Sequence, residues 1–86
     1  QLLIGRADAA EGFFPDIDLE TWDGEHLGVS RRHALLTASQ GQVFITDLNS
    51  TNFTFVNHQV LPAGQKTPLS PWDIVQFGQL VLVYEG

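Results

Sequence analysis

The chain has 86 residues, of which 43% are hydrophobic and 10% aromatic. This is enough for one small domain with its own core, and it argues against wholesale disorder. The formal net charge is −6, from ten acidic and four basic side chains. Binding to nucleic acid or to an anionic membrane requires a basic face, so the charge argues against both partners.

The absence of cysteine excludes a disulfide scaffold, a thiolate zinc site and a thiol nucleophile. No apolar run approaches the roughly 20 residues that a membrane helix requires. There is no signal-peptide pattern and no initiator methionine. We therefore expect one domain, residues 1–86, that belongs to a longer protein and resides in the cytoplasm.

Short segments typical of β-strands follow one another along the chain, separated by glycine and proline. The expected strands are Gln1–Ile4, Ile17–Leu19, Ala34–Thr37, two within 42–57, Ile74–Phe77 and Gln79–Glu85. The last of these is apolar on both faces, which predicts a strand buried on both sides. No segment has the apolar spacing of a helix, so the pattern predicts an all-β sandwich. Residues 7–16 are expected to form an ordered loop anchored by Phe13 and Phe14.

Three polar motifs stand at the expected junctions of strands and loops. They are Gly5-Arg6, the segment from Ser30 to His33, and Ser50-Thr51-Asn52. The loops at one end of a sandwich converge on a single surface, so we expect these motifs to meet. Arginine offers a planar fork of donors, and serine and threonine offer hydroxyl donors. This set of side chains suits a phosphate group, which carries two negative charges at most and three acceptor oxygens.

The order and spacing of these motifs resemble those of the forkhead-associated (FHA) domain, a family of phosphothreonine-binding modules. The resemblance covers nearly the whole chain, including residues 69–78 (LSPWDIVQFG), which are similar to the family's L-x-x-G-D-x-I-x-x-G ending. It implies an FHA-type (SMAD/FHA-like) β-sandwich of two antiparallel sheets, eleven strands in full. Because this chain begins close to its first motif, we expect one or two N-terminal strands to be missing and a sheet edge to be left unpaired.

The resemblance also implies roles for individual residues. Arg6, Ser30, Arg31 and Thr51 match positions that contact the phosphate, and Asn52 matches the asparagine that hydrogen-bonds the peptide backbone. The expected partner is a phosphothreonine-containing protein or peptide, presented after the action of a Ser/Thr kinase. The resemblance implies no enzyme activity, cofactor or metal, and a monomeric state is expected.

Gly5 and His33 match positions that support the site, the glycine by permitting a turn and the histidine by bracing neighbouring loops. Arg32 is expected to point away from Arg31, because side chains alternate along a strand. The chain departs from the family pattern at Phe53 and Trp72, where turn glycines are usual. Phe53 implies either an altered turn or a ring at the rim of the site. Trp72 is expected to pack in the core or against a turn.

The same residues also allow three other hypotheses: an interaction module, a hydrolase and a metal site. A phosphate-independent interaction module, or a dimer formed through the open strand edge, is the main alternative. A hydrolase built on Ser30, His33 and Asp47 lacks the G-x-S-x-G turn that presents such a serine. A metal site at the three histidines lacks the close spacing that pairs ligands.

Overall fold

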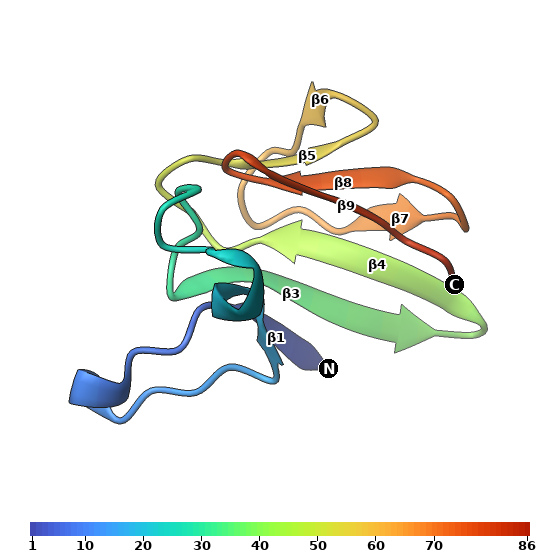
Figure 1. Cartoon of the computed structure of the whole chain (residues 1–86). Helices are drawn as coiled ribbons and strands as arrows, with labels where there is room; N and C mark the ends of the chain where they lie inside the picture. Colours follow the sequence, from blue (N-terminus) through green and yellow to red (C-terminus); the bar gives the residue numbers. More distant parts are fainter.

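The computed structural model describes all 86 residues and shows two β-sheets packed face to face (Figure 1). The first sheet has the order β2-β1-β3-β4-β7 and the second the order β6-β5-β8-β9. Every strand pair is antiparallel except β1 with β2. The structure confirms the predicted all-β sandwich.

The strands of the first sheet are Leu2–Gly5 (β1), Ile17–Asp18 (β2), Arg32–Ser39 (β3), Gln42–Asp47 (β4) and Thr67–Leu69 (β7). Those of the second are Thr54–Val56 (β5), Gln59–Val60 (β6), Ile74–Phe77 (β8) and Leu80–Val83 (β9). Two 3-10 helices, Ala9–Glu11 (η1) and Leu19–Trp22 (η2), lie between β1 and β3. No helix is long and apolar enough to cross a membrane.

Two strands were not expected, and one was expected in the wrong environment. β6 and β7 are short, and β7 contains Pro68, which weakens the strand signal in the sequence. Pro68 is tolerated because β7 is the last strand of its sheet, where a missing backbone N–H breaks no inner pair. β9 is also an edge strand, and Val81 and Val83 are 53% and 51% exposed. The prediction that this strand is buried on both faces is therefore wrong.

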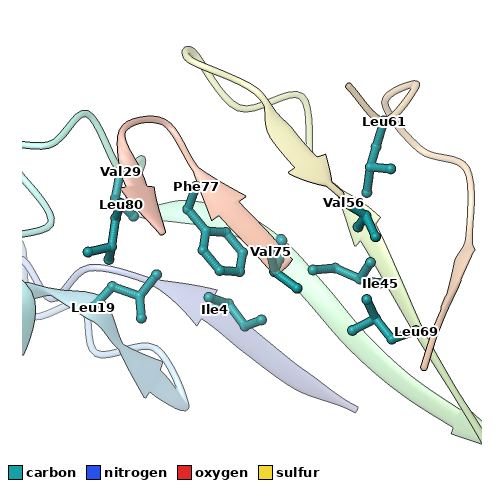
Figure 2. Close-up of a cluster of buried hydrophobic side chains, with 11 residues drawn as sticks. Ile4, Leu19, Val29, Ile45, Val56, Leu61, Leu69, Val75, Phe77 and Leu80 are labelled. Carbon is teal, nitrogen blue, oxygen red and sulfur yellow. The ribbon is translucent and has the colours of Figure 1, made fainter. Parts of the chain in front are cut away.

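The core lies between the two sheets and is built from small and medium-sized aliphatic side chains with one phenylalanine (Figure 2). Its members are Ile4, Leu19, Val29, Ala34, Ile45, Val56, Leu61, Leu69, Val75, Phe77 and Leu80. Leu19 comes from η2 and Val29 from the loop before β3. The loops that approach the end of the sandwich are thus anchored directly in its core.

A bulge between β1 and β3 sets the direction of the side chains at the start of β3. Ile4 pairs with Ala34 but Gly5 pairs with Arg32, so β3 has one additional residue at His33. As a result His33 and Ala34 are both fully buried although they are neighbours in one strand. Gly5 is required here because a Cβ atom on it would lie 1.7 Å from the carbonyl oxygen of Arg31. The sequence predicted that Gly5 permits a turn, whereas the structure gives it a close contact with the backbone of Arg31.

We predict that Gly5→Ala lowers the free energy of unfolding by about 3 kcal/mol or more, because the backbone of Arg31 must move to admit the methyl group. Gly64→Ala is the control, since Gly64 has a φ of +78° but nothing within 4 Å of its Cβ position. Its loss, from the left-handed backbone alone, is about 1 kcal/mol. Urea unfolding of both variants measures the difference, and equal losses would contradict the role given to the contact with Arg31.

Candidate functional site

The three polar motifs meet at one end of the sandwich, as predicted. The loops that follow β1 and β4 and the loop that precedes β3 lie at the same end, on the left of Figure 1. Ser30, Arg31 and Thr51 line one polar cavity of about 600 Å³. The rest of its lining comes from Glu11, Gly12, Phe13, Arg32, Asn49 and Ser50. Only one of these nine residues is hydrophobic, so the cavity suits a polar or charged group.

A direct hydrogen bond joins the second and third motifs. The backbone N–H of Thr51 donates to Ser30 Oγ over 3.1 Å. Because the serine oxygen acts here as an acceptor, the hydroxyl hydrogen of Ser30 remains available to a ligand. Ser30 is partly buried and Thr51 is exposed. The pair therefore offers a positioned donor at the mouth of the cavity.

The loop after β4 takes its shape from a buried carboxylate. Asp47 is 2% exposed, and its Oδ1 accepts hydrogen bonds from the hydroxyls of Ser50 and Thr54. Its Oδ2 accepts from the backbone N–H of Ser50 over 3.1 Å. Sequence reasoning considered Asp47 only as a member of a hydrolase triad and missed this bracing role. The signal that could have found it is a buried Asp followed by Ser and Thr three and seven positions later.

His33 connects two loops through its ring. Its Nδ1 accepts a hydrogen bond from the backbone N–H of Ser30 over 3.0 Å, and its Nε2 lies 2.9 Å from the carbonyl oxygen of Phe53. An Nδ1 acceptor requires that the hydrogen is on Nε2, so the ring is neutral and donates to Phe53. Burial lowers the pKa of His33 below 6.5, although the hydrogen bond to Phe53 and the charge of Asp47 act in the opposite direction.

The lowered pKa of His33 makes stability depend on pH. The unfolded chain binds a proton at His33 more tightly than the folded chain does, so stability is complete above about pH 6.5 and decreases as the pH falls below it. We predict a slope of up to about 1.4 kcal/mol per pH unit in this range. Denaturant unfolding between pH 7 and pH 5 measures it.

His33→Gln is the control for this dependence. The variant is less stable, but its side chain does not titrate, so its stability changes less between pH 7 and pH 5. NMR of the ring protons, compared with those of exposed His26 and His58, identifies the group that titrates. An equal slope in both proteins would contradict the assignment.

Arg6 and Asn52 do not line the polar cavity, but each is hydrogen-bonded to the loop that carries Ser30. The Nε of Arg6 donates to the carbonyl oxygen of Val29 over 2.7 Å, which fixes the guanidinium beside the residue that precedes Ser30. The amide nitrogen of Asn52 donates to the carbonyl oxygen of Gly28 over 3.0 Å. Both side chains thus connect the loop before β3 to another loop and keep further polar atoms for a ligand.

Arg31 and Arg32 both line the cavity and both contact the loop after β1. Arg31 forms a salt bridge with Asp8 over 3.1 Å, and the guanidinium of Arg32 lies 4.7 Å from the centre of the Phe13 ring. The expectation that Arg32 points away from Arg31 is therefore wrong, because β3 begins at Arg32 and Arg31 lies in the bend before it, where strand alternation does not apply. Phe13 anchors its loop as expected, whereas Phe14 is 70% exposed and does not.

The two positions that depart from the family pattern keep the backbone that a glycine favours. Phe53 has a φ of +70° and Trp72 a φ of +75°, which costs each about 1 kcal/mol relative to an ordinary backbone. Phe53 is 54% exposed and follows Asn52 directly, and its positive φ shows that the turn is retained. Trp72 is 69% exposed in the turn before β8, so of its two expected environments, the core and a turn, the structure excludes the core.

The geometry does not match that of a serine hydrolase. Ser30 Oγ accepts from Thr51, while the two ring nitrogens of His33 contact the backbone at Ser30 and Phe53. In a triad the histidine instead accepts the proton of the serine hydroxyl. No group of three or more His, Asp or Glu side chains is arranged to hold a metal ion.

Comparison with known proteins identifies a family and several relatives. The FHA domain model matches residues 2–78. The oxoglutarate dehydrogenase inhibitor of Corynebacterium diphtheriae is 33% identical over 84 residues, which are 98% of this chain and 54% of that protein. The chain thus spans about half the length of this curated relative.

Two solved structures have the same fold. One comes from work on phosphothreonine-dependent FHA domain interactions, with a TM-score of 0.72 and 28% identity over 95% of this chain and 72% of that chain. The other is the FhaA FHA domain in complex with the intracellular domain of Rv3910. Its TM-score is 0.72 and its identity 29%, over 95% of this chain and 76% of that chain.

Proposed function

The chain belongs to the FHA family, and we propose that it is a non-catalytic module that binds phosphothreonine in a partner protein or in its own parent chain. The observation that carries this proposal is the polar cavity in which Ser30, Arg31 and Thr51 come together. A Ser/Thr kinase supplies the ligand, which agrees with the cytoplasmic location that we also propose. The relative named as an inhibitor supports a regulatory role.

Each polar residue has a distinct task in this proposal. The hydroxyl of Ser30 donates to a phosphate oxygen, and Arg31 and Thr51 contact the same group from the other sides of the cavity. Arg6, held by Val29, directs its remaining guanidinium hydrogens toward the phosphate. Asn52 has its amide nitrogen near Gly28, and its carbonyl oxygen accepts from the peptide backbone. Gly5 and His33 support these loops without contacting the ligand.

The salt bridge between Asp8 and Arg31 is part of the resting state of this cavity. The side chain of Arg31 is 51% exposed and that of Asp8 is 25% exposed, so solvent screens the pair and it contributes little to stability. A phosphate carries more charge than one carboxylate and forms stronger hydrogen bonds with an arginine. Binding therefore transfers Arg31 from Asp8 to the ligand.

We predict that Arg6→Ala weakens binding of a phosphothreonine peptide by at least about thirtyfold, because a charged hydrogen-bonded partner of the phosphate is removed. Isothermal titration calorimetry with a phosphothreonine peptide, and with its unphosphorylated form, measures the effect. Lys66→Ala is the matched control, since it removes the same charge from a side chain that lies over the Phe44 ring instead. Equal binding of the two peptides would contradict the proposal.

A phosphate-independent interaction surface is a second candidate function, which the open edge of β9 favours. Tyr84 exchanges both of its backbone hydrogen bonds with the chain before β8, at Trp72 and Asp73. By alternation, the N–H and C=O groups of Val81 and Val83 point away from β8. Neither of these residues is charged, and edges without charge or proline pair readily with another strand.

We predict that Val81→Lys abolishes any dimer formed through this edge, because a charge on β9 opposes strand addition. Size-exclusion chromatography with light scattering measures the mass. Val60→Lys is the matched control, since Val60 is 54% exposed on β6 at the other edge of the same sheet. A wild-type chain that stays monomeric at millimolar concentration would exclude dimerisation through this edge.

A further inference from the structure

Phe53 combines an unfavourable backbone with an exposed aromatic ring. Its φ of +70° is one that bulky residues rarely adopt, and its ring is 54% exposed. Neither the stability of the turn nor the packing of the core accounts for a phenylalanine here. An unfavourable conformation that the surrounding structure enforces is a feature of ligand-binding sites.

The backbone of Phe53 is held from two sides. Its carbonyl oxygen accepts hydrogen bonds from His33 Nε2 over 2.9 Å and from the N–H of Gly78 over 3.1 Å. The residues before it are also fixed, because Thr51 contacts Ser30 and Asn52 contacts Gly28. The direction in which the ring leaves the loop is therefore set before any ligand arrives.

The backbone of Phe53 belongs to a junction of loops that contains two glycines, Gly28 and Gly78. A Cβ atom on Gly78 would lie 2.8 Å from the carbonyl oxygen of Gly28, so the turn after β8 and the loop before β3 are in close contact. The side-chain amide of Asn52 also donates to the carbonyl oxygen of Gly28. Phe53 is the aromatic side chain at this junction, and no charged residue takes part in these contacts.

The path from the phosphate cavity to the ring is short. Thr51 lines the cavity and Phe53 follows two residues later, so at most about 7 Å separates their Cα atoms. A peptide that has its phosphate in the cavity and crosses Asn52 reaches the ring within about three residues. The peptide side chain that contacts the Phe53 ring loses water on the face that touches the ring.

We propose that Phe53 is a specificity-determining residue that selects an apolar side chain within three positions of the phosphothreonine. This inference rests on the proposed function and adds the chemistry of a flanking residue to it. An aliphatic side chain removes the exposed ring from water, whereas a charged one loses hydration there without gaining a partner.

The experiment compares peptides that differ only beside the phosphothreonine. One peptide has alanine at the three positions on either side, and six others have leucine at one of these positions. We expect the wild-type chain to bind one leucine peptide about fivefold to tenfold more tightly than the alanine peptide. In Phe53→Gly this preference disappears, while the alanine peptide binds as before.

Trp72→Gly is the matched control. Trp72 also has an aromatic side chain on a positive φ, of +75°, but it lies in the turn between β7 and β8, at the other end of the sandwich from the cavity (Figure 1). Both variants relieve an unfavourable backbone, so both should unfold at a higher temperature than the wild type. Only Phe53→Gly should lose the preference for leucine.

The outcomes separate this inference from the function on which it rests. If no phosphothreonine peptide binds, the proposed function fails. If all seven peptides bind the wild type equally, phosphate recognition stands and the selection by Phe53 is overturned. If Phe53→Gly weakens the alanine and leucine peptides by the same factor, the residue supports the loop rather than selecting the ligand, and the inference is also overturned.

Discussion

The buried carboxylate of Asp47 is the constraint on which the binding end of this domain depends. A charged group with 2% exposure is costly unless hydrogen bonds replace its hydration. The three donors that replace it come from Ser50 and Thr54, on the two sides of Thr51 and Asn52. The residues proposed to face the ligand are thereby held between two fixed points. The side chain of Thr51 and the carbonyl oxygen of the Asn52 side chain then remain available for binding, while the Asn52 amide nitrogen contacts Gly28.

The few positive charges of the chain are distributed in a way that suits a single anionic ligand. Three of the four basic side chains, Arg6, Arg31 and Arg32, lie in or beside the polar cavity, and each already has a contact within the domain. Preorganised arginines lose less side-chain freedom when a phosphate arrives. The surrounding net charge of −6 is unfavourable for an extended polyanion, so this charge distribution suits one phosphate group better than a nucleic acid.

The sequence predicted the architecture and the convergence of the motifs because both follow from local patterns. Alternating apolar residues locate the central strands, and the three polar motifs stand where those strands end. The errors arise where tertiary contacts decide the outcome. Arg31 lies in a bend before β3, so strand alternation did not separate it from Arg32. The position of β9 at an edge exposed Val81, although its sequence resembles that of an inner strand. Asp47 was missed because its role depends on donors that only the folded loop brings within reach.

Because His33 is neutral, the phosphothreonine is the partner in the proposed complex whose charge changes as the pH falls from neutral. Both ring nitrogens are occupied by backbone groups and burial lowers the pKa of His33, so this histidine adds no positive charge to the cavity near neutral pH. The arginines keep their charge throughout this range. A phosphomonoester, in contrast, takes up its second proton near pH 6. In the proposed complex, the acid limit of recognition is therefore set by the phosphothreonine rather than by a change of charge among the arginines of the cavity.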